Sequence, residues 1–424
     1  MMQKFMESGY KQVNFNEKAD VYVVNTCTVT NMSDKKSRQM LRKTRQQNGE
    51  ALIVAIGCYA QTNKSELEKM PEIDLVLGNN EKLDIVSYVE ECDAQRKKET
   101  CITDVMQQKE FVDLGIISYT EKTRAVIKVQ DGCDRFCSYC IIPYARGRVR
   151  SRQKENILKE IEQIVQKGIK EVVITGIHIA SYGKDFQNEY RLIDLLEDIN
   201  KIEGLKRIRL GSIEPTIITE EFLERLKKLE KVCHHFHLSL QSGCDATLQR
   251  MNRKYTTEEF EEIVRLIRKT FIDAILTTDI IVGFPGETEQ EFQATYAFLE
   301  KIKFFKMHIF KYSPREGTKA AKMQEQISAI IKEERSDKLL LLSGNNEKEI
   351  LSQYIGRCVE VLFEQKEGEY IKGHTANYIM VKSKDNVKEN QIRKVEIEMV
   401  EGLELMGKRC NIIVIILTLK CKEK

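Results

Sequence analysis

The chain has 424 residues, enough for two or three domains with separate hydrophobic cores. Its 68 lysines and arginines barely exceed its 65 aspartates and glutamates, so net charge alone does not indicate a nucleic-acid partner. The N-terminus lacks the apolar core of a signal peptide, and the longest apolar runs, such as 412–417, fall far short of the roughly 20 residues that a membrane span needs. A cytoplasmic protein without a membrane partner is expected.

Residues 1–95 alternate apolar runs with amphipathic helical patterns. The runs are 20–26, 51–57 and 73–77, and the helical patterns are 33–47, 64–70 and 81–90. Apolar runs separated by helices indicate parallel strands that are covered on both faces. We therefore predict an N-terminal doubly wound α/β domain, followed by a polar, charged linker at 96–122.

The first two predicted strands each end at a cysteine, Cys27 and Cys58. Open α/β sheets place their ligands at the carboxyl ends of the strands. One cysteine at such an end is unremarkable, but two at matching ends predict a ligand site.

Residues 123–350 repeat a strand and a helix six times without a glycine fingerprint for dinucleotides. The predicted strands are 124–130, 171–177, 206–212, 235–241, 274–283 and 304–312, and the helices are 154–167, 191–202, 219–230, 256–270, 288–301 and 328–349. This pattern predicts a partial (β/α)6 barrel, whose chemistry would lie on the loops after the strands. The glycine, serine and proline of those loops are also ordinary turn formers.

The loop after the first of these strands carries Cys133, Cys137 and Cys140, spaced four and then three apart. Disulfides are not expected among the 12 cysteines, because the chain shows no secretion signal and is far larger than a disulfide-stapled scaffold. Seven further cysteines show no ligand-like spacing and are expected to be inert: Cys92, Cys101, Cys233, Cys244, Cys358, Cys410 and Cys421.

Three cysteines in one loop point to an incomplete ligand set. Structural zinc takes four protein ligands, and an ordinary iron–sulfur cube takes four thiolates. A cube held by three thiolates leaves one iron open for S-adenosylmethionine, whose reductive cleavage yields a radical able to break an unactivated C–H bond. Zinc completed by His234, His235 or His237 is the alternative, although these histidines lie along a predicted strand.

Three other segments are candidates for contact with RNA. Arg146, Arg148, Arg150 and Arg152 recur at every second position, so they would line one face of an extended segment and contact phosphates; a solvated edge is the alternative. The basic helix 33–47 offers a second such surface or simply an exposed face. Residues 351–419 form short alternating stretches typical of a small antiparallel, OB-like β-barrel, where Lys372 and Tyr378 would bind RNA by charge and stacking. A capping β domain with a solvated face is equally compatible with that composition.

The cysteine loop resembles that of the radical S-adenosylmethionine methylthiotransferases, and the resemblance covers nearly the whole chain. Six further segments carry it: "NTCTVTN", "GCYAQ", "TGIHIASYG", "LSLQSGCDATLQRMNRKYT", "TTDIIVGFPGET" and "YSPREGTKAA". The resemblance implies a [4Fe–4S] cluster on the cysteine loop, a second [4Fe–4S] cluster in the N-terminal domain, S-adenosylmethionine as cofactor and a C-terminal TRAM domain. It also implies tRNA and a flavodoxin- or ferredoxin-type electron donor as partners.

The motifs look most like the branch that methylthiolates carbon 2 of N6-threonylcarbamoyladenosine at tRNA position 37, giving the 2-methylthio product. The branches acting on isopentenyladenosine in tRNA or on a ribosomal protein are the alternatives. By resemblance Gly176 lies near the methionine end of the cofactor, Ser212 and Glu214 near its ribose, and Asp279 to Gly283 near its adenine. No catalytic residue beyond the cluster ligands is expected.

The N-terminal domain departs from the family pattern. The family's second cluster takes three cysteines, the first in a motif like "TLGCKVNQ" after an opening strand; Cys27 and Cys58 match the second and third, and nothing matches the first. Cys92 or Cys101 would be substitutes. We therefore expect a truncated domain that cleaves S-adenosylmethionine but transfers methylthio groups poorly. The alternative function is a catalytically impaired iron–sulfur protein that binds RNA.

Overall fold

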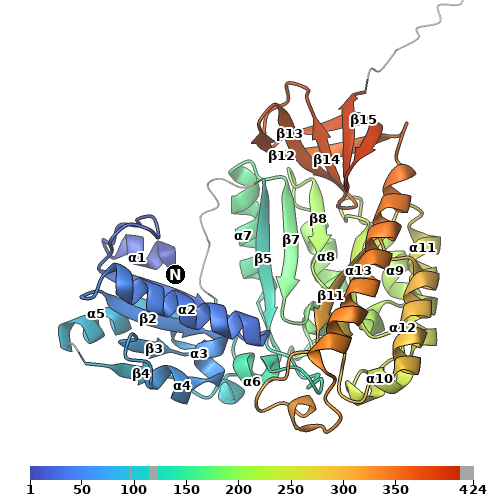
Figure 1. Ribbon diagram of the computed structural model, residues 1–424. Coiled ribbons are helices and arrows are strands. Elements are labelled where there is room, and N and C mark those ends of the chain that lie inside the picture. Colours follow the sequence, from blue (N-terminus) through green and yellow to red (C-terminus); the bar gives the residue numbers. More distant parts are fainter. Residues whose placement is uncertain (96, 114–122, 411–424) are drawn as a thin grey trace, which may run out of the picture. The chain divides into compact units, whose positions relative to one another are not determined.

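The computed structural model describes residues 1–95, 97–113 and 123–410 (Figure 1). The chain folds into two compact units, and the boundary between Ser343 and Gly344 falls inside the long helix α13 (Ala329–Ser352). None of the helices in the described ranges combines the length and the apolar character needed to cross a membrane.

The first unit begins with a parallel four-stranded sheet in the order β1-β2-β3-β4. Its strands are β1 (Val21–Thr26), β2 (Leu52–Gly57), β3 (Leu75–Leu77) and β4 (Glu99–Cys101). One face packs on α2 (Asn31–Gln47), α3 (Cys58–Thr62) and α4 (Lys64–Glu68), and the other packs on α1 (Met2–Glu7) and α5 (Ile85–Gln95). The doubly covered sheet predicted from the sequence is confirmed.

The predicted linker holds more structure than its composition indicates. Strand β4 lies within 96–122, because Thr100 and Cys101 pair with Val76 and Leu77 at the open edge of the sheet. Residues 96 and 114–122 of that linker lie outside the described residues.

Six parallel strands then form the partial barrel. They are β5 (Arg124–Asp131), β7 (Glu171–Gly176), β8 (Arg207–Leu210), β9 (His235–Gln241), β10 (Ile275–Val282) and β11 (Lys306–Lys311). The sheets β6-β5-β7-β8 and β9-β10-β11 meet through bridges from Ile208 to Val232 and from Ile213 to Leu238; β6 (Arg150–Ser151) is a short antiparallel addition to β5.

Helices cover the outside of these strands, as Figure 1 shows. They are α7 (Lys154–Gln166), α8 (Leu192–Asn200), α9 (Glu220–Lys227), α11 (Thr257–Thr270), α12 (Glu289–Ile302) and α13. Thr256 and Thr288 begin α11 and α12 with reciprocal side-chain caps to Glu259 and Glu291, which satisfy backbone N–H groups that the helices leave unpaired. Because the six barrel strands are parallel, the loops that follow them all lie at the same end of the barrel, as predicted.

The second unit contains a closed five-stranded barrel in the order β12-β13-β14-β16-β15. Its strands are β12 (Cys358–Glu367), β13 (Tyr370–Thr375), β14 (Met380–Ser383), β15 (Ile392–Glu401) and β16 (Glu404–Arg409). Val361, Phe363 and Leu405 fill its core. The predicted antiparallel barrel is observed except that β14 and β16 run parallel, and the end of the expected domain, 411–419, lies outside the described residues.

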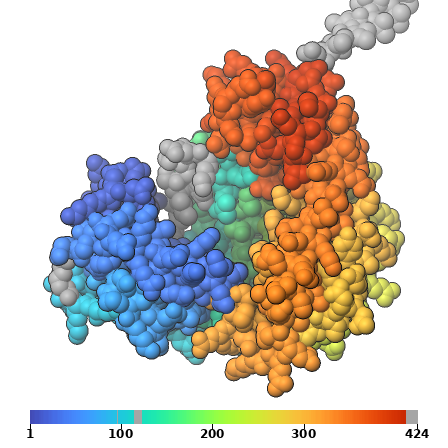
Figure 2. Space-filling model, viewed as in Figure 1, coloured from blue at the N-terminus to red at the C-terminus, as the bar shows by residue number. Residues whose placement is uncertain are grey.

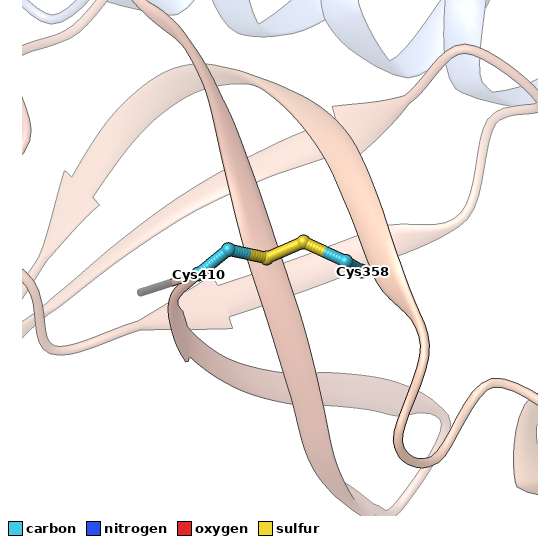
Figure 3. The surroundings of a disulfide bond; sticks show 2 residues. All are labelled: Cys358 and Cys410. Atoms are coloured by element: carbon cyan, nitrogen blue, oxygen red, sulfur yellow. A yellow bond between two sulfur atoms is a disulfide. The ribbon is translucent and has the colours of Figure 1, made fainter. Parts of the chain in front are cut away.

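A disulfide joins Cys358 to Cys410 in this barrel (Figure 3). Cys358 pairs with Glu396 on β15, and the Cys410 amide donates to the Lys394 carbonyl of the same strand. The two cysteines therefore flank β15 with Cα atoms 6.5 Å apart, a separation that a disulfide spans. The expectation that these two cysteines are inert and that the chain lacks disulfides is wrong, because strand pairing brings together residues far apart in the sequence.

Candidate metal centre and cofactor pocket

The cysteine loop after β5 is fixed by backbone contacts. Gln130 Nε2 donates to the carbonyls of Asp131 and Gly132, and the Cys133 amide donates to the Gly147 carbonyl over 3.0 Å. Gly132 has a φ of +73°, and a Cβ placed there would lie 1.8 Å from the Arg148 carbonyl oxygen. Only glycine fits this close approach, so the loop turns back on itself directly after the strand.

The loop presents its cysteines to one another. Burial, with a smaller contribution from the charge of Cys137, raises the pKa of Cys133 to about 11 and that of Cys140 to about 12. The Cys140 amide also donates to the Cys137 carbonyl over 2.9 Å. Binding a metal would therefore displace protons from at least two thiols.

The described residues contain no group of three His, Cys, Asp or Glu side chains gathered tightly enough to hold a single metal ion. A cube differs from a single ion, because each thiolate binds a different iron atom and the sulfurs stand further apart. Three partly exposed thiols on one constrained loop fit a three-thiolate cluster. The zinc alternative gains no support, because His235 and His237 bond to Thr277 on β10 and His234 bonds to Asp273.

Arg253 is a site residue that the sequence analysis missed. Its side chain is 5% exposed, and Nη1 lies 3.4 Å from Cys137 Sγ while Nη2 donates to the Ser239 carbonyl over 3.0 Å. Nε also donates to the Tyr255 hydroxyl. A guanidinium held by several partners places positive charge beside one thiol of the loop. Its only signal in the sequence was its place in the quoted motif "MNRKYT".

Glu214 lies in the same network. Its carboxylate is 3.0 Å from His178 Nε2, 3.4 Å from Arg253 Nη2 and 3.6 Å from Arg135 Nη2. Burial would raise the pKa of Glu214, but the hydrogen bond from His178 and the two arginines together lower it below its ordinary value. Glu214 is therefore a charged carboxylate already engaged by protein partners, and its contact with a cofactor ribose stays a prediction.

The other predicted cofactor residues lie at the same end of the barrel. Ser212 is exposed after β8, and Asp279 on β10 lies 3.1 Å from His237 Nε2. A Cβ on Gly176 would meet the Gln130 carbonyl at 2.8 Å, and one on Gly283 would meet Lys332 Cγ at 2.3 Å. Close packing thus accounts for both glycines, and their roles toward a cofactor stay predictions.

A cavity of about 220 Å³ opens beside the cysteine loop. The barrel contributes Cys140, Gln241, Asp279 and Phe310, and the N-terminal domain contributes Val29 and Thr30. Its walls thus combine apolar side chains with an amide and a carboxylate, a mixture that suits a planar, polar-edged ligand.

Cys27 and Cys58 form a second candidate site. The pair Thr26 and Gly57 is in register on β1 and β2, so the two cysteines directly follow matched positions. Cys58 begins α3 and accepts a hydrogen bond from Arg146 Nε over 3.1 Å. The possible substitutes differ: the Cys92 thiol is buried and bonds to the Lys97 carbonyl, and the Cys101 thiol bonds to Glu99.

The four predicted RNA-binding arginines do not share one exposed face. Arg150 and Arg152 are buried, the first bonded to the Arg146 carbonyl and the second paired with Asp113 and Glu160. The Arg146 side chain is 21% exposed and turns toward Cys58. Arg148 is 54% exposed and pairs with Asp134, so RNA contact stays a prediction for this arginine, while protein partners engage the less exposed side chains of the other three.

In the second unit the Tyr378 ring stacks on His374 with centroids 4.6 Å apart, and its own φ is +72°. Tyr378 is 38% exposed. Lys372 is paired with Glu367 and Glu404. The RNA-binding roles of Lys372 and Tyr378 stay predictions.

Comparisons with known proteins give a consistent relationship. The family model of the Radical SAM superfamily matches residues 127–299, and that of Uncharacterized protein family UPF0004 matches residues 1–78. The chain is 41% identical to the threonylcarbamoyladenosine tRNA methylthiotransferase MtaB of Bacillus subtilis, over 89% of this chain and 85% of that protein. It is 42% identical to MtaB of Aquifex aeolicus, over 89% and 91%.

More distant similarities follow. A tRNA-2-methylthio-N(6)-dimethylallyladenosine synthase of Clostridium novyi is 35% identical, over 84% of this chain and 80% of that protein. Among solved structures, the radical S-adenosylmethionine methyltransferase TsrM of Kitasatospora setae aligns with a TM-score of 0.53 at 18% identity, over 70% of this chain and 66% of that chain. That likeness concerns the fold alone.

Proposed function

This chain belongs to the radical S-adenosylmethionine methylthiotransferase family, and we propose that it methylthiolates carbon 2 of N6-threonylcarbamoyladenosine in tRNA. The observation that carries the reaction class is the loop of Cys133, Cys137 and Cys140 at the carboxyl end of β5, beside a cavity that both domains line. The choice of substrate rests on sequence identity. Over similar lengths, the chain is 41% identical to the threonylcarbamoyladenosine enzyme of Bacillus subtilis and 35% identical to the dimethylallyladenosine enzyme of Clostridium novyi.

The residues of the loop would hold a [4Fe–4S] cluster through three thiolates. When bound, this cluster and S-adenosylmethionine together supply the 5′-deoxyadenosyl radical that removes hydrogen from carbon. Gly132 fixes the path of the loop, and Arg253 stabilises negative charge at the Cys137 sulfur. An electron donor of the flavodoxin or ferredoxin type completes the proposal, because reductive cleavage consumes an electron.

We propose that the substrate nucleoside binds in the cavity beside the loop. Phe310 and Val29 offer apolar surface for a base that leaves its stack, and Gln241 and Asp279 offer hydrogen-bonding groups for its polar edge. His237 Nε2 lies 3.1 Å from the Asp279 carboxylate and orients it. Cys27 and Cys58 would supply two of the three cysteine ligands of the second cluster, on the domain that forms the other wall.

The test uses the full chain, reconstituted anaerobically with iron and sulfide and supplied with a reductant and S-adenosylmethionine. One arm receives tRNA that carries threonylcarbamoyladenosine, and the matched arm receives the same amount of tRNA that carries isopentenyladenosine. Mass spectrometry of digested tRNA measures the methylthio nucleosides, and chromatography measures 5′-deoxyadenosine. We expect the methylthio product in the first arm.

Two results would decide against the proposal. Product only in the isopentenyladenosine arm would reassign the substrate. Cleavage of S-adenosylmethionine by the Cys137→Ala variant at the parent rate would refute the cluster site itself. The Cys244→Ala variant is the matched control, because Cys244 lies in another loop of the barrel and is expected to leave cleavage unchanged.

A further inference from the structure

Arg315 lies in the loop after β11 and is 5% exposed. Its guanidinium crosses from the barrel to the N-terminal domain, where Nη1 donates to Asn31 Oδ1 over 2.6 Å. Nη2 donates to Thr28 Oγ1 and to Asp34 Oδ2, each over 2.5 Å. A buried, forked guanidinium with three acceptors on one partner segment is a strong and directional contact.

The contacted segment begins directly after Cys27. Thr30 caps the N-terminus of α2 by accepting from the Ser33 amide, and the Asn31 amide donates to Ser313 Oγ from the same barrel loop as Arg315. Farther along α2, Ser37 Oγ accepts from the Cys27 amide over 3.4 Å. The contacts of Arg315 therefore reach the backbone of Cys27 through α2.

The same segment forms a wall of the cavity beside the cysteine loop. Val29 and Thr30 line it from the N-terminal domain, and Ser313 and Arg315 line it from the barrel. Figure 2 shows blue atoms of the N-terminal domain meeting orange atoms of the last barrel segment on this face. Loss of the Arg315 contacts would thus loosen both the cavity wall and the strand end that carries Cys27.

We propose that Arg315 is a positioning residue, a latch that holds the Cys27 end of β1 over the mouth of the radical barrel. This role of Arg315 rests on the proposed function in one respect. Methylthio transfer requires the second site and the radical loop to reach one substrate, whereas cleavage of S-adenosylmethionine requires the radical loop alone. Arg315 bonds to Thr28, the neighbour of Cys27, whereas none of its described hydrogen bonds goes to the cysteine loop after β5, so its removal should lower transfer more than cleavage.

The experiment compares the parent chain with Arg315→Met, Arg315→Lys and the control Arg265→Met. Arg265 is 67% exposed on α11 and pairs only with its helix neighbour Glu262 among the contacts described, so its loss should leave the molecule unchanged. Hydrogen exchange measures the backbone amides of residues 28–36, with the amides of β9 and β10 as an internal reference. Methylthio nucleoside and 5′-deoxyadenosine are measured in the same preparations.

For Arg315→Met we expect exchange at 28–36 to accelerate about tenfold or more, because a buried charge-assisted contact is lost. Exchange in β9 and β10 should not change, and the yield of methylthio nucleoside per 5′-deoxyadenosine should fall. Arg315→Lys should lie between, because it keeps the charge but loses the fork.

Unchanged exchange at 28–36 in Arg315→Met would overturn the latch. Equal acceleration in β9 and β10 would mean that Arg315→Met destabilises the whole molecule. The variant Asn31→Ala, which removes only one acceptor, then tests the latch. Faster exchange confined to residues 28–36 in Asn31→Ala would support the latch, and unchanged exchange there would overturn it. If the parent chain forms no methylthio product, that result counts against the proposed function. Hydrogen exchange at residues 28–36 would still test the role of Arg315 independently.

Discussion

Arg146 Nε donates a hydrogen bond to Cys58 Sγ over 3.1 Å, and this contact joins the two cysteine sites of the chain. Arg146 ends α6 (Ile142–Arg146), the short helix that follows the Cys140 loop, whereas Cys58 begins α3 in the N-terminal domain. Asn79 strengthens the junction by donating to the Ala145 carbonyl over 2.8 Å. The radical loop and the second site are therefore parts of one packed interface.

Replacing Arg146 by Met should weaken iron binding at the second site by about 10- to 100-fold, the usual cost of removing an outer partner of a metal ligand. The measurement is chelator competition in a chain whose Cys133, Cys137 and Cys140 are all alanine, so that iron on the radical loop does not contribute. Arg265→Met in the same background is the control. Equal retention of iron in both variants would contradict the role of Arg146.

Gly132→Ala should abolish iron binding on the radical loop. Its Cβ would lie 1.8 Å from the Arg148 carbonyl oxygen, which is backbone and has no rotamer with which to retreat, and its φ of +73° strains any other residue. Gly49→Ala is the matched control, because a Cβ there meets nothing within 4 Å. Iron content and visible absorbance after reconstitution check the result, and a normal cluster in Gly132→Ala would refute the structural account of the loop.

The features that the sequence predicted well depend on local patterns. Strand β9 matches the predicted 235–241, and α11 and α12 begin within a residue of the predicted positions, because hydrophobic periodicity and threonine caps act over a few residues. The cysteine loop was found from its spacing and its place after a strand. These signals need no knowledge of distant partners.

The features that the sequence did not predict depend on distant partners. The spacing of Arg150 and Arg152 suggested one exposed face. In the structure Arg150 bonds to the Arg146 carbonyl at the end of a helix, and the buried side chain of Arg152 pairs with Asp113 and Glu160. Arg253 and Arg315 likewise gain their roles from residues more than a hundred positions away, Cys137 and Asp34. A regular spacing of charges cannot show which of them the fold will bury.

The disulfide between Cys358 and Cys410 should stabilise the second unit. It closes a loop with a sequence separation of 52, and loops of that order gain about 2–4 kcal/mol from a disulfide. Cys358→Ser should lower the free energy of unfolding of this unit by that amount in oxidising buffer and by much less in dithiothreitol. Calorimetry in both buffers checks the prediction, with Cys244→Ser in the first unit as control; equal values for parent and Cys358→Ser in oxidising buffer would contradict it.

Iron loading of the radical loop should improve as the pH rises. Burial holds the pKa of Cys133 at about 11 and that of Cys140 at about 12 in the metal-free chain, so both thiols carry protons near neutrality. Ligation releases those protons, and a rise in pH therefore favours the bound state. Apparent iron affinity, measured by chelator competition from about pH 7 to 9, should increase across the range. A flat profile would show that the thiols are already ionised before iron binds.

Arg253→Met should make the radical cluster harder to reduce. The guanidinium places a buried positive charge 3.4 Å from Cys137 Sγ, and reduction adds a negative charge to the cluster that this thiolate would bind. Positive charge and hydrogen bonds at ligand sulfurs favour the reduced form, so their loss should shift the reduction potential to a more negative value and slow the cleavage of S-adenosylmethionine. Iron content should change less, because all three thiols remain.

The control is Arg250→Met, because the Arg250 side chain pairs with Glu291 on α12 rather than with a cysteine of the loop. Redox titration followed by electron paramagnetic resonance measures the potential. A potential equal to that of the parent, with slower cleavage, would assign Arg253 to the support of Glu214 and Ser239 instead of to the cluster.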